Sequence, residues 1–211
     1  MQLTSKEYMQ YIKLAAEKID SNGDYITSLD AVTGDGDHYT NMQLGFSKLV
    51  ENVDAFSILP LSDCFRKIGM TLMSSIGGSS GALYGSAYIA ASKLLQGKDS
   101  IDESLLLDIL QAMLDAIKAR GNAAENMKTM IDALSPTVAA YRDNLSNGVT
   151  GTTLYTAVKK AAEDGAQATK DMEAVKGRAY YQTGKGVGHI DPGAMTMAYQ
   201  IETLMDFIGS L

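Results

Sequence analysis

Apolar residues recur every three to four positions along most of the chain, which is the spacing of amphipathic helices. The stretches with this spacing run over residues 4–20, 40–54, 62–76, 80–96, 102–120, 128–145, 151–174 and 193–209. Between them lie short polar connectors that carry helix-ending signals, such as the Ser-Asn-Gly runs at 21–23 and 146–148. The pattern therefore predicts an all-α protein of about eight helices.

Short connections between helices make neighbours in the sequence antiparallel. We therefore expect an antiparallel up-and-down bundle or barrel, formed by a single domain that spans residues 1–211. Alternate loops of such a bundle lie at the same end. The loops rich in Gly, Asp or His alternate with ordinary turns and cover 30–40, 77–81, 121–128 and 177–193. One end of the bundle is thus predicted to carry the functional site.

Charge and composition limit the classes of partner. The formal net charge of −7 argues against nucleic acid, because a nucleic-acid binder needs a basic face to neutralise phosphates. No apolar run approaches the roughly 18 residues that cross a bilayer, and the N-terminal pattern lacks the apolar core of a signal peptide. The single cysteine, Cys64, suits a reducing compartment. We expect a cytoplasmic protein with no nucleic-acid or membrane partner.

The segment LDAVTGDGDHYTNM, residues 29–42, concentrates three carboxylates in what the pattern predicts to be a loop. Asp30, Asp35 and Asp37 repel one another unless water solvates them or a cation lies among them. Oxygen ligands on a loop suit Mg²⁺ or Ca²⁺ rather than zinc, and the spacing does not match a calcium hand. The alternative is that these residues form a turn, with Asp37 capping a helix that starts near Thr40.

Two of the predicted helix starts follow loops of small residues. Thr40 and Asn41 come after the aspartates, and Ser79 and Ser80 come after two glycines in SSIGGSSGALYG. A helix N-terminus offers free N–H groups and a partial positive charge to a phosphate. A helix corner with serine as the N-cap explains the second motif equally well when that motif is taken alone. A divalent metal beside such a helix start is typical of phosphoryl chemistry.

The other two loops are RGNAAENMKTMID (120–132) and KGRAYYQTGKGVGHIDPGAMTM (176–197). In the first, Gly121 is a predicted helix end, and Met130 at helical spacing is also typical of core packing. The second is long for a bundle connection, and loops of this length are usually functional or mobile. Its Pro192 and Gly193 suit the start of the final helix. Its GKGVG run lacks the strand and the spacing of a Rossmann or P-loop motif.

Taken together, GDGDH with NM, then GGSSG, KTM and GHIDPGA, in this order on a helical chain, resemble one known family. This family comprises the ADP-binding L subunits of phosphotransferase-dependent dihydroxyacetone kinases, and the resemblance covers nearly the whole chain. His38 favours the subunit form, because in the single-chain ATP-using kinases a cysteine usually follows the last aspartate. The Asp-Gly-Asp-Thr-Gly pattern of fatty-acid kinases is absent.

The resemblance implies that Asp30, Asp35 and Asp37 hold two Mg²⁺ ions that bridge the phosphates of a tightly bound ADP. It implies an ADP site made of His38, Tyr39, Thr40, Asn41, Ser79, Ser80, Gly121, Met130, Arg178, Asp191, Pro192 and Gly193. It also implies a relay, in which ADP accepts a phosphoryl group from a phosphohistidine of an M subunit and passes it to dihydroxyacetone on a K subunit. The chain itself would supply no catalytic nucleophile.

Two positions depart from the family pattern. Tyr39 stands where glycine is common, and Asn126–Met127 stands where a Gly-Asp pair is common. One alternative is therefore an L-type subunit that exchanges ADP for free ATP, or that acts on another short ketose. A second is a nucleotide-bound regulatory module that binds a transcription regulator without catalysis. A third is a helical scaffold with solvated aspartates, and a homodimer is also left open.

Overall fold

The computed structural model describes residues 2–211, and these residues form helices joined by short loops, with one isolated β-bridge between Leu3 and Ile101. The α-helices are α1 (Ser5–Ser21), α2 (Gly23–Thr33), α3 (His38–Glu51), α4 (Val53–Ser57), α5 (Leu61–Ser75), α6 (Gly78–Leu94), α7 (Glu103–Gly121), α8 (Ile131–Ser146), α9 (Gly151–Ala168) and α10 (Pro192–Gly209). Three short 3₁₀ segments, η1 (Thr169–Asp171), η2 (Arg178–Tyr181) and η3 (Thr183–Gly186), lie between α9 and α10. The all-α prediction is confirmed.

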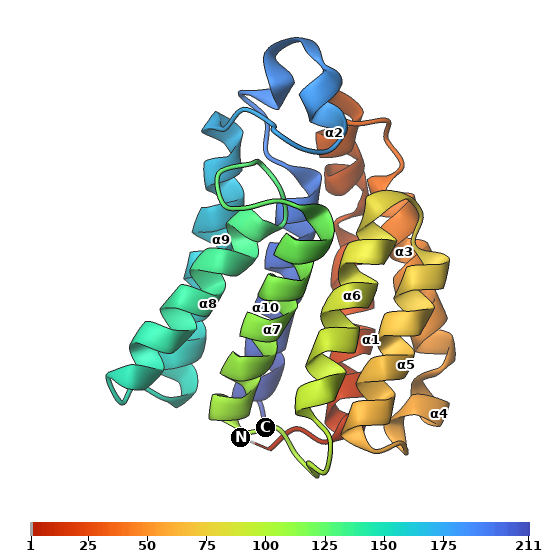
Figure 1. Ribbon diagram of the computed structural model, residues 1–211, viewed down its shortest axis with the longest axis vertical. Helices are drawn as coiled ribbons and strands as arrows, with labels where there is room; N and C mark the ends of the chain where they lie inside the picture. Colours follow the sequence, from red (N-terminus) through yellow and green to blue (C-terminus); the bar gives the residue numbers. More distant parts are fainter. Residues whose placement is uncertain (1) are drawn as a thin grey trace.

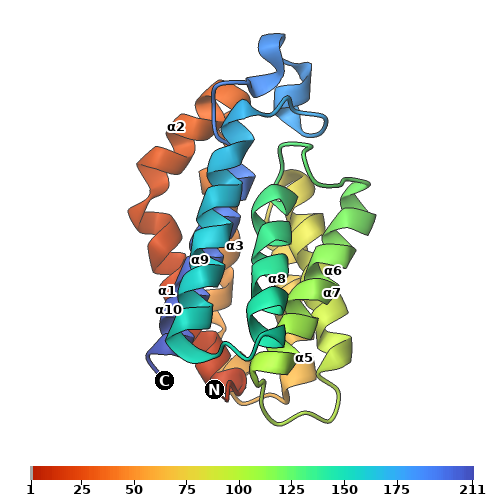
Figure 2. The same cartoon turned by 90° about the vertical axis from the view of Figure 1, so that its left-hand side faces the viewer.

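Eight helices form a closed ring in which each packs against the next. The order around the ring is α1, α3, α5, α6, α7, α8, α9 and α10, and α10 packs against α1 again. These helices run along the long axis of the molecule and alternate in direction between short loops (Figures 1 and 2). Their buried faces meet in one hydrophobic cluster inside the ring. Each predicted helical stretch corresponds to one of these eight helices.

Helix α2 is not among the predicted helices: the sequence pattern assigns no helix to residues 24–29 and predicts a loop over 30–40, which is wrong for residues 30–33. The buried positions of α2 do follow helical spacing, but they are Gly23, Ile26, Asp30 and Thr33, of which only Ile26 is strongly apolar. A search for apolar periodicity cannot detect such a face. As a result, Asp30 lies in the last turn of a helix rather than in a loop.

Other boundaries also differ from the prediction. Helix α3 begins at His38 instead of Thr40, and α9 ends at Ala168 instead of 174. Helix α8 begins at Ile131 instead of 128, because positive φ angles at Asn126 (62°) and Lys128 (58°) interrupt the helical path. The extra helix α4 is a single short turn at the end of the ring away from these loops (Figure 1).

The two ends of the ring carry different loops. One end holds both chain termini and the connections around 52–60, 95–102 and 147–150 (Figure 1, bottom). The other end holds the connections 34–37, 76–77 and 122–130 and the long segment between α9 and α10 (Figures 1 and 2, top). The four loops that the sequence marks as functional therefore lie at the same end.

Within residues 2–211, no helix combines the length and the apolar character that crossing a membrane requires.

Candidate functional site

A cavity of about 550 Å³ opens among the four loops at this end, and its size is within the range of small-molecule sites. Most of the predicted site residues line it: Asp30, Asp35, Asp37, His38, Asn41, Ser79, Ser80, Gly121, Met130, Arg178, Asp191, Pro192 and Gly193. The two exceptions are Tyr39 and Thr40, which lie outside the lining. The ring topology thus brings together residues that are up to 163 positions apart in the sequence, from Asp30 to Gly193.

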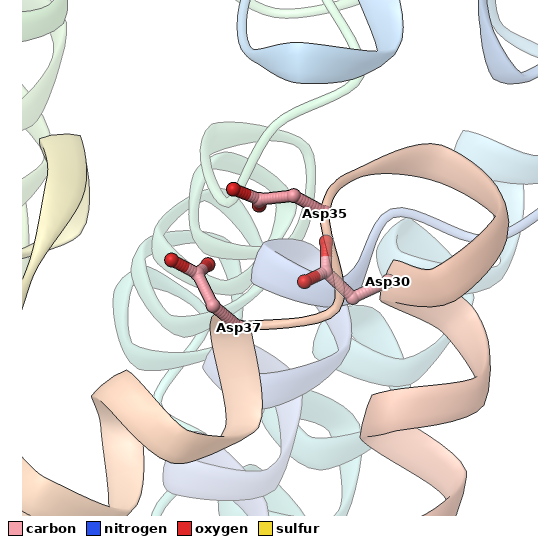
Figure 3. A group of neighbouring side chains, drawn as sticks. All are labelled: Asp30, Asp35 and Asp37. Atoms are coloured by element: carbon pink, nitrogen blue, oxygen red, sulfur yellow. The ribbon is translucent and has the colours of Figure 1, made fainter.

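The three aspartates form a group of carboxylates at one side of the cavity. Asp30 is buried, whereas Asp35 and Asp37 on the following loop are more exposed. One oxygen from each carboxylate lies within 4.8 Å of the others, and Figure 3 shows the three side chains turned toward a common space. Three oxygen donors at this separation fit a hard divalent cation. Asp37 precedes α3 but makes no side-chain capping hydrogen bond, so the capping alternative does not explain it.

His38 connects the aspartate group to the core of the ring. Its backbone N–H donates to Asp30 Oδ2 at 2.9 Å, and its Nε2 lies 3.0 Å from Thr196 Oγ1 on α10. Gln200, one turn later, donates to Thr196 O at 3.0 Å and to the hydroxyl of Tyr84 on α6 at 2.8 Å. Burial lowers the pKa of His38, although nearby carboxylates partly oppose this shift. The imidazole side chain is therefore neutral near pH 7. This hydrogen-bonded chain fixes the orientation of the loop's first helical residue.

Arg178 reaches the aspartate group from the segment between α9 and α10. Its Nη2 lies 2.7 Å from Asp35 Oδ2, and both side chains are partly exposed. Exposed ion pairs contribute little to stability, typically about 0–1 kcal/mol. The pair therefore matters more for where it holds Arg178 than for the free energy of folding.

The glycine-serine turn presents the free end of α6 to the cavity. The helix begins at Gly78, and Gly77 is the N-cap, so the alternative in which a serine caps this helix is wrong. No side chain caps this end, and Ser79 and Ser80 occupy the first turn. Gly78 has φ +64°, a conformation that glycine adopts without strain. The first N–H groups of α6 are thus available to an anion.

Several residues that line the cavity were not predicted as site residues. Apolar ones on α6, α7 and α8 and the connection between the last two form one part of the wall: Ala82, Leu83, Ile117, Ala123 and Ile131. Polar, charged and small ones complete it: Thr33, Gly77, Gly78, Arg120, Lys128, Thr129, Lys176, Gly177 and Ala179. The apolar ones on the helices have the spacing of ordinary core residues, so the sequence contains no signal that separates them from the core. Lys128 and Thr129 do lie in the KTM motif, which marked their neighbour Met130.

The family model for the DAK2 domain matches residues 32–206 of the chain. The chain belongs to the DAK2 domain family. It is 33% identical over 204 residues to the "PEP-dependent dihydroxyacetone kinase, ADP-binding subunit DhaL" of Escherichia coli (strain K12), with 97% of each chain covered. It is 36% identical over 206 residues to the corresponding PTS-dependent subunit of Lactococcus lactis subsp. lactis (strain IL1403), with 98% of this chain and 99% of that one covered. The resemblance to the ADP-binding subunits is confirmed.

A solved structure has the same fold as this DAK2 domain. It is the dihydroxyacetone kinase from C. freundii in complex with AMP-PNP and Mg²⁺, with a TM-score of 0.74 and 26% sequence identity. The match covers 98% of this chain but 34% of that one. This chain therefore spans about a third of the length of that kinase.

Tyr39, the first departure from the family pattern, points away from the cavity of the DAK2 domain. Its hydroxyl accepts from Gln43 Nε2 at 2.8 Å and donates to Asp20 Oδ1 at 3.4 Å. Its ring covers Gly23, where an added Cβ would lie 2.6 Å from Tyr39 Cζ. The tyrosine thus packs α3 against the junction of α1 and α2 and leaves the cavity wall unchanged.

Asn126, the first residue of the second departure (Asn126–Met127), also has a structural explanation. Its φ of +62° lies in the left-handed region, which glycine adopts freely and which asparagine tolerates better than most other residues. Its N–H donates to the buried carboxylate of Asp132, which also accepts from Thr129 N at 2.8 Å. Asparagine can therefore replace the common glycine with the same backbone path.

Asp191→Asn is expected to change how stability depends on pH. Asp191 is the N-cap of α10 and accepts from Ala194 N at 2.8 Å, and burial raises its pKa to about 7 although this hydrogen bond and Lys128 oppose the shift. Between about pH 4 and pH 7 the folded state keeps a proton that the unfolded state releases, so the free energy of unfolding falls as the pH rises. Asparagine caps a helix equally well and carries no charge.

Thermal unfolding of the nucleotide-free protein from pH 5 to pH 8 measures this effect. Over this range the free energy of unfolding of the wild type should fall by about 1–3 kcal/mol more than that of Asp191→Asn. Asp102, the exposed N-cap of α7, provides the control: Asp102→Asn should keep the pH dependence of the wild type. Parallel curves for the wild type and Asp191→Asn would contradict the prediction.

Proposed function

We propose that this chain is the ADP-binding subunit of a dihydroxyacetone kinase and acts as a phosphoryl relay. The observation that supports this most directly is the position of the aspartate group, which shares one cavity with the uncapped start of α6. The names of the two relatives identify each as an ADP-binding subunit of such a kinase. The names apply to those proteins, and their near full-length match to this chain supports the same role here.

The carboxylates of Asp30, Asp35 and Asp37 would hold Mg²⁺, as two ions. The donor set fits this metal, because all three ligands are oxygens and they converge within 4.8 Å. When bound, Mg²⁺ would offset the negative charges of the carboxylates and of the nucleotide phosphates together. This explains how a chain with a net charge of −7 can hold an anion.

The remaining lining would hold ADP, which we propose is tightly bound. The first turn of α6 with Ser79 and Ser80 would receive the phosphates, together with the start of α3 from His38 to Asn41. In that stretch Tyr39 and Thr40 would contribute through their backbone, because their side chains do not line the cavity. The apolar wall, which includes Met130, would hold the base, with Gly121 close by.

Two groups would cover the nucleotide: Arg178 from the long segment, and the start of α10 from Asp191 through Pro192 to Gly193. The chain would act by positioning the phosphates and by neutralising their charge, without a nucleophile of its own. A phosphohistidine on an M subunit would be the donor, and dihydroxyacetone on a K subunit the acceptor. A cytoplasmic location stays a prediction.

Chemical analysis of the purified protein tests this proposal. The protein would be prepared without added nucleotide, dialysed extensively and denatured, and the extract assayed for ADP and magnesium. We expect both in stoichiometric amounts, and transfer to dihydroxyacetone when a K subunit and a phosphorylated M subunit are added. Loss of ADP on dialysis, with turnover on free ATP, would favour the exchanging subunit instead. An extract without nucleotide or magnesium would contradict the proposal.

A further inference from the structure

Lys128 is a buried lysine at the cavity wall, with 1% of its surface exposed. Its Nζ donates to two backbone carbonyls, Thr169 O and His189 O, both at 2.5 Å. These carbonyls lie at the two ends of the segment that joins α9 to α10. We call residues 169–191 the cover. We call the place where the two ends of the cover come together the neck. One side chain from another loop thus binds both sides of the neck.

Other bonds hold the neck at the same place. Asp191 N donates to Thr169 Oγ1 at 2.9 Å, and Gly188 N donates to Lys170 O at 2.7 Å. The rest of the cover consists of short 3₁₀ turns and irregular backbone, and beyond the neck its backbone bonds to the loop between α7 and α8 through Val175 N to Met127 O at 3.2 Å. The neck is where the bonds from Lys128 and between the two ends of the cover are concentrated, so it is the main point at which the cover is held to the ring.

The neck determines where the cover meets the aspartate loop. Beyond the neck, Arg178 forms its ion pair with Asp35, and Gln182 Nε2 donates to Gly34 O at 3.4 Å. Both contacts are at exposed or partly buried positions and are weak by themselves. A shift of the neck would therefore carry Arg178 away from the mouth of the cavity.

Lys128 occupies this position at an energetic cost. Its φ of +58° is unfavourable for a lysine, and burial of an ammonium group is costly unless the group is paired. The two carbonyls satisfy two of its three N–H groups, and the carboxylates of Asp191, Asp132 and Asp171 are close enough to favour its charged form. Neither carbonyl belongs to a group that we assign to the nucleotide, so the lysine acts on the cover's backbone.

We propose that Lys128 is a positioning residue that clasps the neck of the cover and thereby slows the release of bound nucleotide. The identity of the ligand rests on the proposed function, whereas the clasp is a property of the chain without nucleotide. Lys128 thus joins the loop between α7 and α8 to the cover, and residues of both line the cavity.

The test compares Lys128→Met with Lys185→Met. Methionine has a similar length but donates no hydrogen bond, so it leaves both carbonyls at the neck unpaired. Lys185 lies on the cover, is partly exposed and pairs with Glu173 at 3.3 Å, so its replacement removes the same charge without touching the neck. In the nucleotide-free protein, Lys128→Met should speed amide hydrogen exchange within 169–191 by about tenfold or more. Exchange in α1, α5 and α6 should stay at the wild-type level, as should all exchange in Lys185→Met.

Nucleotide release is measured on the same variants. ADP should leave Lys128→Met about ten to a hundred times faster than the wild type, with an association rate close to normal. Lys185→Met should release ADP at the wild-type rate. A purely structural loss would instead raise exchange throughout the helices.

A second variant keeps the inference testable if Lys128→Met does not fold. Thr169→Val removes the acceptor for Asp191 N, keeps the side-chain shape and leaves Lys128 in place. It should raise exchange in the cover and ADP release in the same direction, by several-fold.

Three results would overturn the clasp. The first is that amide exchange in the cover of Lys128→Met equals that of the wild type. The second is that exchange in Lys128→Met is faster but ADP leaves it at the same rate as it leaves Lys185→Met, and the third is that Thr169→Val shows wild-type exchange in the cover and wild-type ADP release. If the wild type holds no ADP at all, the proposed function fails, and the exchange experiment still decides whether Lys128 holds the neck.

Discussion

Asp35→Asn should abolish the retention of ADP by the purified protein while the helical fold stays intact. The substitution removes one of three carboxylates whose oxygens converge within 4.8 Å, so the cation would lose a charged ligand. The affinity for the nucleotide with its metal should fall by about a hundredfold or more, since an interaction between charged groups is lost. Stability should hardly change, because the ion pair that Asp35 forms with Arg178 is partly exposed.

Nucleotide content after dialysis and thermal unfolding, measured side by side, check this expectation. Asp54→Asn serves as the matched control, because Asp54 is exposed on α4 at the opposite end of the ring. The control should retain ADP as the wild type does. If Asp35→Asn still copurified with stoichiometric ADP, the aspartate group would not be the metal site.

Gly81→Ala should destabilise the protein and weaken nucleotide binding together. An added Cβ at Gly81 would lie 2.3 Å from the backbone oxygen of Ile76 and 3.2 Å from that of Leu72. Alanine normally favours a helix over glycine by about 1 kcal/mol, but here the glycine-serine turn must move to relieve the clash. We expect a net loss of about 1–3 kcal/mol, as for other overpacked sites.

The control for this substitution is Gly209→Ala at the end of α10. There an added Cβ would lie 3.5 Å from Tyr155 Cδ2, which is an ordinary contact. This variant should be at least as stable as the wild type in thermal unfolding. Equal melting temperatures for the two variants would show that the turn tolerates a side chain at Gly81. A destabilised Gly81→Ala that retained ADP fully would show that the turn does not hold the phosphates.

The ring and the gathering of the four loops at one end were predictable from the sequence because both depend on long-range regularities. Apolar spacing identifies a helix whose buried face is apolar, and short loops make neighbours antiparallel. Helix α2 escaped detection because its buried face carries Gly23, Asp30 and Thr33. A carboxylate at a buried helical position hides this helix from the apolar pattern. The same carboxylate, that of Asp30, lies at the candidate site.

The wall of the cavity was only partly predictable. Motifs identify residues on loops, such as the aspartates and Ser79, because Gly, Asp and Ser stand out against a helical pattern. Leu83 and Ile117 line the cavity with the spacing of core residues, and periodicity cannot separate the two roles. Lys128 is the clearest example of a residue whose proposed role could not be predicted. That role depends on two backbone carbonyls that lie 41 and 61 positions away in the sequence.

Both termini lie at the end of the ring opposite the cavity, where Leu3 pairs with Ile101 and α10 ends at Gly209 (Figure 1). A domain or an affinity tag joined to either terminus therefore attaches at the far end and leaves the mouth open. In the longer C. freundii kinase, the matched part is 34% of the chain. A covalent connection at either end of the chain therefore does not restrict access to the cavity in this fold.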